Sequence, residues 1–371
     1  MHVGLNLAFL TPGTMGGLEV YSRQLAEALA ARGDTALTLF LSRPAARDRS
    51  WGELGRTVVL GVDPARRVDW VRADLGAVPR AAARAGVDLV HSLASTGPAL
   101  GRFRRVVTVH DLNYLVHPET HFGARALGMR ALVPLAVRRS HRVIVPSRAT
   151  CRDLVERLGA DEARIDVVPE GVGQPARPGA RMSAALERRL DGRGRPIALS
   201  VSAKRPHKNL RRLIAALALL PAGRRPLLVL PGYPTPHEAE LRVEAEERGV
   251  GGDVRFLDWL SEDDLEALYA SAACFVFPSL YEGFGLPVLE AMARGVPVAT
   301  SGRASLAEVA GDAALLFDPE DERSIAGALA RLLEDAELAG RLREQGRRQA
   351  ARFSWAQAAD GTVASYRRSL A

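Results

Sequence analysis

The chain contains very little lysine and very little cysteine. Among its 50 basic residues only Lys204 and Lys208 are lysines, and both fall in the stretch Ser-Ala-Lys-Arg-Pro-His-Lys-Asn. The two cysteines, Cys151 and Cys274, lie far apart in the sequence, and Cys274 sits in the apolar run Ala-Cys-Phe-Val-Phe. This spacing implies neither a disulfide framework nor a zinc site, and Cys274 is expected in a buried strand.

Long apolar runs and aromatic residues are scarce as well. No stretch reaches the roughly 18 uninterrupted apolar residues of a membrane-spanning helix. The first apolar run, residues 3–8, has no basic leader before it, which favours a strand over a signal peptide and predicts a cytoplasmic protein. The net charge is +7, but the arginines are scattered and aromatic residues make up only 5% of the chain. The composition therefore predicts no nucleic-acid partner.

One segment leaves a peripheral membrane contact open. Residues 124–142 mix apolar side chains such as Leu127 and Leu135 with arginines such as Arg130 and Arg139. A basic helix lying at the inner face of a membrane has this composition. An ordinary helix packed on a sheet, with its arginines in water, explains the same pattern.

The paired lysines indicate where an anion would bind. Lysine offers a compact point charge that arginine does not reproduce, so the only two lysines in a chain rich in arginine mark a candidate phosphate site. Chance placement on an exposed loop is the alternative.

Short β-branched runs alternate with helical patterns, which predicts an α/β fold with parallel sheets. At 371 residues the chain is long enough for two domains. The predicted strands are residues 3–8, 36–41, 58–60, 88–91, 106–110, 143–145 and 166–168 in the first half, and 197–201, 227–230, 254–257, 274–277, 296–300 and 314–317 in the second.

The Gly- and Pro-rich segment 171–195 predicts a linker, with one helical stretch around 184–190. We therefore expect a first doubly wound domain over 1–170 and a second over 196–353. Ligands of such sheets bind at the carboxyl ends of the strands, so a central cleft between the domains is the expected site.

Residues 278–300 form the segment richest in chemical signals. A strand ends near Pro278, and a helix is expected to open near Leu286 with Pro287 in its first turn. Gly283 and Gly285 allow backbone amides to approach a ligand, and the helix start adds free N–H groups and a positive dipole end. A cradle for phosphate or hydroxyl groups is predicted, whereas a simple strand-to-helix turn would leave the neighbouring carboxylate unexplained.

Glu282 and Glu290 flank this turn. A helical spacing of eight would separate them by roughly 12 Å along the axis, more than the roughly 5 to 9.5 Å of paired glycosidase carboxylates. They are better placed to hold two ends of an extended ligand. The sequence contains neither an Asp-x-Asp motif nor a Gly-x-x-x-x-Gly-Lys loop, so the charge of a diphosphate would fall to the lysines.

The motifs together resemble those of the family 4 retaining glycosyltransferases, which have the GT-B fold of two Rossmann-like domains, and among them the mannosyltransferases. The family's two glutamates separated by seven residues are matched by Glu282 and Glu290. Further matches span nearly the whole chain: Gly16-Gly17, His110-Asp111, Val-Pro-Ser147, Val-Val-Pro-Glu-Gly-Val172, Pro-His-Lys208-Asn209, Leu-Ala-Glu308-Val and Phe353-Ser-Trp355.

The resemblance implies roles for individual residues. Glu290 would hold the nucleotide ribose, Glu282 would face the transferred sugar, and Lys208 would bind the diphosphate. His110 would lie near the reacting sugar. The resemblance also implies that the segment 354–371 forms a helix that crosses back to the first domain. It further implies that backbone amides of Gly283, Phe284, Gly285 and Leu286 contact sugar hydroxyls and the distal phosphate of the donor. Gly16 and Gly17 would shape the acceptor and phosphate side of the cleft.

The chain departs from the family pattern at one position. Many members carry Gly-Arg shortly before the Lys-Asn pair, where this chain has Ser202-Ala203. Lys204 or Arg205 is the expected replacement for the missing arginine.

The expected activity is a metal-independent, retaining transfer of a hexose from a nucleotide diphosphate sugar to a hydroxyl acceptor, with no resident cofactor. The pattern favours GDP-mannose as donor, and UDP-sugars remain possible. A glycan, a lipid-linked glycan or a small molecule would fit as acceptor. Two alternatives stay open at this point, a nucleotide-sugar epimerase of the same architecture and a non-catalytic glycosyltransferase-like partner.

Overall fold

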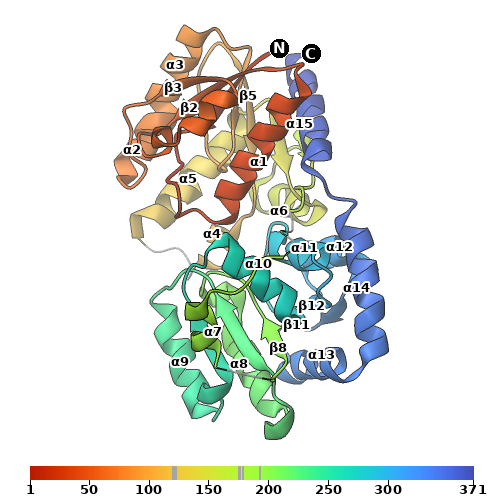
Figure 1. The fold of residues 1–371 in the computed structure, drawn as a ribbon. Helices are drawn as coiled ribbons and strands as arrows, with labels where there is room; N and C mark the ends of the chain where they lie inside the picture. Colours follow the sequence, from red (N-terminus) through yellow and green to blue (C-terminus); the bar gives the residue numbers. More distant parts are fainter. Residues whose placement is uncertain (119–122, 174–176, 178, 192–193) are drawn as a thin grey trace. The chain divides into compact units, whose positions relative to one another are not determined.

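A computed structural model gives the arrangement of the chain and describes residues 1–118, 123–173, 177, 179–191 and 194–371. The chain divides into two compact units (Figure 1). Unit 1 comprises Met1–Gly173 and Phe353–Ala371, and unit 2 comprises Gln174–Arg352. The boundary therefore precedes most of the segment predicted to be a linker, whose helix Ala184–Leu190 belongs to unit 2.

Unit 1 is a parallel sheet with helices on both faces (Figure 1). Its strand order is β3-β2-β1-β4-β5-β6-β7. The strands are β1 (His2–Leu7), β2 (Ala36–Leu41), β3 (Arg56–Val59), β4 (Leu89–Ser92), β5 (Arg104–Thr108), β6 (Arg142–Val145) and β7 (Ile165–Val167). The helices are α1 (Gly17–Arg32), α2 (Arg67–Arg72), α3 (Val78–Ala85), α4 (Asn113–Val116), α5 (Gly123–Arg139), α6 (Arg148–Leu158) and α15 (Trp355–Leu370).

Unit 2 repeats the plan with the strand order β10-β9-β8-β11-β12-β13. Its strands are β8 (Ile197–Leu199), β9 (Leu227–Pro231), β10 (Val254–Leu257), β11 (Ala272–Phe277), β12 (Val298–Ser301) and β13 (Leu315–Phe317). Its helices are α7 (Ala184–Leu190), α8 (Leu210–Leu219), α9 (His237–Glu247), α10 (Glu262–Ser271), α11 (Leu286–Ala293), α12 (Ala304–Ala310), α13 (Glu322–Glu334) and α14 (Ala336–Ala350).

The predicted α/β class and the predicted strands are confirmed, with strand bounds that differ by at most two residues. Continuous apolar runs identified the central strands because a parallel sheet covered on both faces buries both sides of them. Cys274 lies in β11 and is fully buried, as its apolar surroundings suggested.

The last helix, α15, belongs to unit 1 and lies beside α1 (Figure 1). Ser354 caps its start by accepting a hydrogen bond from the Gln357 N–H. The side chains of Val363 and Tyr366 are buried in the core of unit 1. The end of the chain therefore groups with the first unit.

Helix α5 shows why residues 124–142 have a mixed composition. Val133, Ala136 and Val137 are buried in a cluster with residues of β5 and β6, whereas Arg138 and Arg139 are exposed. This half of the helix packs on the sheet as an ordinary amphipathic helix does. The side chains of residues 124–127 lie outside the described part, and a membrane contact stays a prediction.

Candidate active site

Each sheet has one place where the chain reverses its direction of strand addition. In unit 2 this switch point lies between β8 and β11, and in unit 1 it lies between β1 and β4. Ligands of open α/β sheets bind outside the carboxyl ends of the strands at such points. Lys208 follows β8, and Glu282 follows β11. The switch point of unit 2 therefore brings together two residues predicted to contact the donor.

The turn that carries Lys208 is fixed to the loop after β11. Asn209 adopts a left-handed conformation with φ 59° and donates from its side chain to the carbonyls of Pro278 (3.0 Å) and Pro319 (2.7 Å). The carbonyl of His207 accepts from the Leu280 N–H at 2.9 Å. An asparagine tolerates this backbone conformation better than most residues, and its amide holds two loops at once. These contacts set the direction of the Lys208 side chain.

Lys208 and Glu282 form an ion pair. The Lys208 Nζ donates to Glu282 Oε1 at 2.5 Å, and the two side chains are 17% and 16% exposed. The Lys208 Nζ also lies 5.5 Å from the ring centroid of Phe277, in a cation–π contact. The cation expected to bind a diphosphate and the carboxylate expected to face the sugar thus meet directly.

The glycine loop after Glu282 is tightly packed and leads into α11. Gly285 has φ 127°, and a Cβ there would come within 2.7 Å of Leu306 Cδ2. Ser305 donates to the Glu282 carbonyl at 2.7 Å. The positive φ favours glycine at position 285, and a Cβ there would press on the end of the Leu306 side chain. Helix α11 then begins at Leu286 with Pro287 in its first turn, as predicted, and the Leu286 N–H lies at its positive dipole end.

Glu290 lies on α11 beside a buried tyrosine. The Tyr269 hydroxyl donates to Glu290 Oε2 at 3.3 Å. Burial and the Glu290 charge raise the pKa of Tyr269 well above its ordinary value, so the hydroxyl stays a donor. Arg294 lies over the Tyr269 ring and donates to Glu266 Oε2 at 2.7 Å. This packing keeps the Glu290 carboxylate at a fixed place on the first turns of the helix.

Lys204 is placed differently from Lys208, although the two are neighbours in the sequence. Its side chain is fully buried, and its Nζ donates to the carbonyls of Gly232 and Leu257 at 2.7 Å each. Glu238 Oε2 lies 3.5 Å away. Burial lowers the pKa of Lys204, and the nearby Glu238 charge opposes that effect. The ammonium group joins the loops after β9 and β10, so we assign it a structural role and remove it from the candidates for the diphosphate.

Arg205 is the remaining candidate for the missing family arginine. It is exposed, and no side-chain hydrogen bond or ion pair engages its guanidinium within the part of the chain that the structure describes. It directly precedes the turn that carries Lys208. Arg205 is thus an exposed positive charge three positions before Lys208, with no competing partner among the described residues.

In unit 1, Gly16 and Gly17 lie where α1 begins. Gly16 has φ 56° and ψ −129° and accepts at its carbonyl from the N–H groups of Glu19 and Val20. Few residues other than glycine adopt this backbone conformation. The start of a 16-residue helix therefore lies close to the carboxyl end of β1, on the side of the sheet where ligands bind.

His110 follows β5 and uses both ring nitrogens. Nδ1 lies 3.1 Å from Glu170 Oε1, and Nε2 lies 2.8 Å from the Leu93 carbonyl oxygen. With Glu170 ionised both partners are acceptors, and this geometry favours a proton on each ring nitrogen. Burial alone would lower the pKa of His110, but the hydrogen bond and charge of Glu170 and the Leu93 carbonyl outweigh it and raise the pKa.

A buried chain of hydrogen bonds holds the Tyr21 ring against His110. The Tyr21 ring meets the His110 ring edge-on at 4.6 Å, and the Tyr21 hydroxyl lies 3.0 Å from Thr108 Oγ1. Thr108 Oγ1 lies 2.8 Å from His91 Nε2, and His91 Nδ1 lies 2.7 Å from the Tyr366 hydroxyl. Helix α15 thus helps to fix the position of His110.

Glu170 is the partner of His110 that the sequence interpretation missed. It is 5% exposed and makes the only charged contact with His110 among the described residues. Its place in Val-Pro-Glu-Gly directly after β7 was the available signal, because a carboxylate at a strand end is either paired or functional.

Comparison with known proteins identifies the family. The sequence profile described as Glycosyltransferase Family 4 matches residues 15–173, and the profile described as Glycosyl transferases group 1 matches residues 187–349. The O-antigen chain mannosyltransferase B of Escherichia coli is 33% identical over 270 residues, which cover 71% of this chain and 70% of the relative. The chain is a family 4 glycosyltransferase. The predicted family and enzyme class are confirmed.

Two further relatives agree with this assignment. The D-inositol 3-phosphate glycosyltransferase of Nocardia farcinica is 32% identical over 403 residues, covering 97% of this chain and 86% of the relative. The serotype-specific mannosyltransferase WbdA of Escherichia coli is 31% identical over 278 residues, and the match spans 34% of its length. The glycosyltransferase is thus similar over most of its length to enzymes that transfer sugars.

Solved structures agree on the fold. Sucrose-phosphate synthase from Thermosynechococcus elongatus superposes with a TM-score of 0.78 at 24% identity, over 99% of this chain and 98% of that protein. Anabaena HepE, solved in complex with UDP and glucose, superposes with a TM-score of 0.77 at 20% identity, over 99% of each chain. The GT-B fold predicted from the sequence is confirmed. None of the described helices is long and apolar enough to cross a membrane.

Proposed function

We propose that this glycosyltransferase moves a hexose, with mannose favoured, from a nucleotide diphosphate sugar to a hydroxyl acceptor, with retention of the anomeric configuration and without a metal ion. The ion pair between Lys208 and Glu282 at the switch point of unit 2 carries the proposal. A diphosphate would accept from Lys208 and Arg205, and Glu282 would then be released to accept from hydroxyl groups of the sugar.

The start of α11 supports a second set of donor contacts. The N–H groups of a helix start and its dipole stabilise negative charge. The distal phosphate and sugar hydroxyls would lie over Gly283, Phe284, Gly285 and Leu286. Glu290, held by Tyr269, would accept from the ribose hydroxyls. Two cationic side chains and a helix start provide counter-charge for a leaving diphosphate, which is the task a metal ion has in other transferases.

The fixed imidazolium argues for a particular role of His110. Because both of its N–H groups are engaged, His110 lacks a free lone pair and is a poor general base. We assign it the role of a fixed positive charge at the carboxyl edge of the unit 1 sheet. The proton of the acceptor hydroxyl would pass to an oxygen of the leaving phosphate as the acceptor–carbon bond forms and the carbon–phosphate oxygen bond breaks on the same face.

The donor is inferred from the relatives. Their names include mannosyltransferases that match 62% to 72% of this chain, which favours GDP-mannose over a UDP-sugar. A thermal-shift series with GDP, UDP, ADP and dTDP in the presence of a chelator tests this, because binding stabilises the folded state by mass action. GDP should give the largest shift. A shift that requires divalent metal would contradict the metal-independent mechanism. A larger shift with UDP would contradict GDP-mannose as the donor.

A further inference from the structure

Unit 1 carries a second group of cations, remote from His110. An open pocket of about 510 Å³ lies among the ends of α5, α15 and the starts of β5 and β6. Six arginines line it, together with one histidine, two serines and the last residue of the chain. The arginines are Arg104, Arg105, Arg138, Arg139, Arg164 and Arg368. We call this group the arginine pocket.

The arginine pocket is separate from the candidate active site. Arg104 is the first residue of β5, whereas His110 follows the last residue of the same strand. At about 3.3 Å per residue the two positions are about 20 Å apart. Ligand binding at the carboxyl ends of the strands therefore does not explain cations at the amino ends.

Part of the cluster has an ordinary structural explanation. Arg105 Nε donates to the Arg139 carbonyl at 2.8 Å, and Arg164 Nη1 donates to the Ser140 carbonyl at 3.2 Å. These carbonyls lie at the carboxyl end of α5, where orphan acceptors and a negative dipole end attract cations. Two of the six arginines are thus accounted for by the helix end.

A third arginine is also paired. Arg368 Nη2 lies 2.9 Å from Asp166 Oδ1, and the same carboxylate accepts from Arg142. Asp166 is thereby shared by two cations. Burial raises the pKa of Asp166, but hydrogen bonds from Arg142 and Ser365 and the charges of Arg142 and Arg368 outweigh it, so the pKa is lowered overall.

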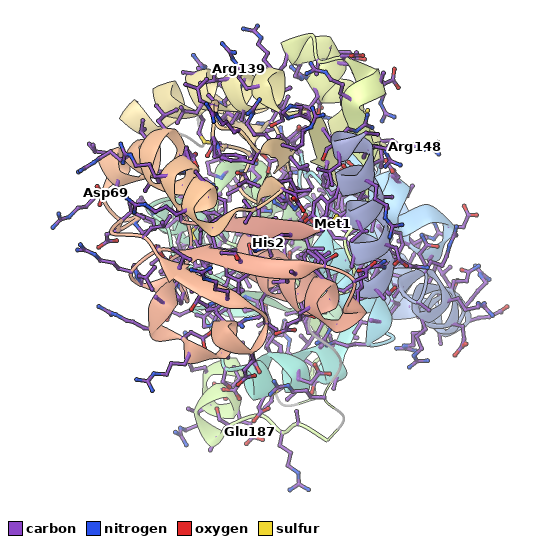
Figure 2. The ribbon with its side chains drawn as sticks, turned by 90° about the horizontal axis from the view of Figure 1, so that it is seen from above. Met1, His2, Asp69, Arg139, Arg148 and Glu187 are labelled. Atoms are coloured by element: carbon purple, nitrogen blue, oxygen red, sulfur yellow. The ribbon has the colours of Figure 1, made fainter. Side chains whose placement is uncertain are left out.

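The other three arginines have no such partner. No side-chain hydrogen bond or ion pair engages Arg104, Arg138 or Arg139 within the described ranges of the chain. Arg139 lies near the end of α5 and is labelled in Figure 2. Burial and then the charges of Arg139 and Arg104 lower the pKa of Arg105. The cations therefore repel one another across the pocket.

His141, the histidine of the arginine pocket, is also affected by the positive charge of the arginines. Burial, and then the charges of Arg105 and Arg104, lower the pKa of His141, so the ring is neutral at neutral pH. An adjoining pocket of about 480 Å³ shares Arg104, Arg105 and His141, and its carboxylate, Asp88, already accepts from the His2 backbone N–H at 2.7 Å. Asp88 is the only side-chain carboxylate that lines either pocket among the described residues, and the terminal residue Ala371 borders the first pocket.

We propose that the arginine pocket binds a multivalent phosphate anion, either free in solution or presented as a lipid headgroup. Guanidinium groups match phosphate oxygens with pairs of parallel hydrogen bonds. The volume falls in the range of small-molecule sites. An anion there would neutralise three unpaired cations, at a place that the sugar transfer does not use.

Calorimetry with inorganic pyrophosphate tests this in the intact protein. The pocket variant is Arg138→Gln/Arg139→Gln, and its control is Arg80→Gln/Arg84→Gln. The control removes the same charge from exposed positions on α3, in the same unit. We expect two sites in the unchanged protein and in the control. The pocket variant should lose one of them, with affinity at least about tenfold lower.

The variant Lys208→Met distinguishes the donor site from the arginine pocket in the same calorimetric titration. It should remove pyrophosphate binding at the donor site and leave binding at the pocket intact. Equal pyrophosphate binding by the pocket variant and the control would overturn the proposal, whatever Lys208→Met does. Arg104→Gln serves as a second pocket variant if circular dichroism shows that the first one is misfolded.

Vesicles distinguish the two sources of phosphate. The pocket would be assigned to a headgroup if the protein sediments with phosphatidylglycerol vesicles but not with phosphatidylcholine vesicles. This sedimentation should be lost in the pocket variant and abolished by added pyrophosphate. Pyrophosphate binding without sedimentation would assign it to a free anion. If the unchanged protein binds neither probe at the pocket, the proposal is wrong.

Discussion

Replacing Lys208 with methionine should weaken nucleotide binding strongly. The Lys208 ammonium lies 2.5 Å from Glu282 and its side chain is 17% exposed, so water screens it little. A charge-assisted hydrogen bond contributes about 1.5 to 3 kcal/mol. Its loss should raise the Kd for GDP about 10- to 150-fold. Methionine keeps a similar length and packing, so the effect reports the charge.

Glu282→Gln should act in the opposite direction on the nucleotide alone. In the free protein the Glu282 carboxylate competes with a diphosphate for Lys208. Removing that negative charge should leave GDP binding unchanged or make it up to about tenfold tighter. Transfer of the sugar should nevertheless fall at least about tenfold, because a strong acceptor for sugar hydroxyls is lost.

Both variants are measured by calorimetry with GDP in the presence of a chelator. Arg224→Met is the control, since it breaks a pair with Glu334 in the same unit at 3.0 Å whose side chains are 71% and 54% exposed. Exposed pairs contribute little, so its Kd should stay within about twofold of the unchanged protein. The reasoning is refuted if Lys208→Met binds GDP as the control does, or if Glu282→Gln weakens GDP as much as Lys208→Met.

Three further predictions concern the supporting residues. Lys204→Met should lower the free energy of unfolding by about 2 to 6 kcal/mol in urea titrations, because two buried carbonyls lose their donor, while the folded variant keeps its GDP affinity. Tyr269→Phe should weaken GDP by about three- to tenfold in calorimetry, since Glu290 loses a donor. Glu170→Gln should lower the His110 pKa in an NMR titration. The raised pKa of His110 stabilises the folded protein fully below pH about 6.5, and this stabilisation is lost as the pH rises through the folded-state pKa. The free energy of unfolding of the variant should therefore fall less over the same pH range.

The fold could be predicted from sequence because local signals agree with the final structure. The central predicted strands are buried on both faces of a parallel sheet, whereas β3, β7 and β13 are partly exposed, and the start of α11 carries its own marker in Pro287. Lys208 and Glu282 follow predicted strands in the sequence, so they were expected at the carboxyl edge of the sheet. Such signals depend on neighbours in the chain and need no knowledge of the tertiary contacts.

The roles of the two lysines could not be separated by local pattern. Lys204 and Lys208 are four positions apart in a loop, yet one ammonium is buried against two carbonyls and the other meets Glu282. The partners of both come from segments 28 to 74 residues away. Glu170 was missed for the same reason, since its contact with His110 joins residues 60 positions apart. Tertiary packing decides such cases.

Proton NMR of a reaction with GDP-mannose, a chelator and a panel of simple hydroxyl acceptors tests the central claim most directly. The account predicts an α-configured product that forms without divalent metal, so that the configuration of the donor is kept. A β-configured product, a strict requirement for metal, or conversion of the donor alone into a second nucleotide sugar would contradict it.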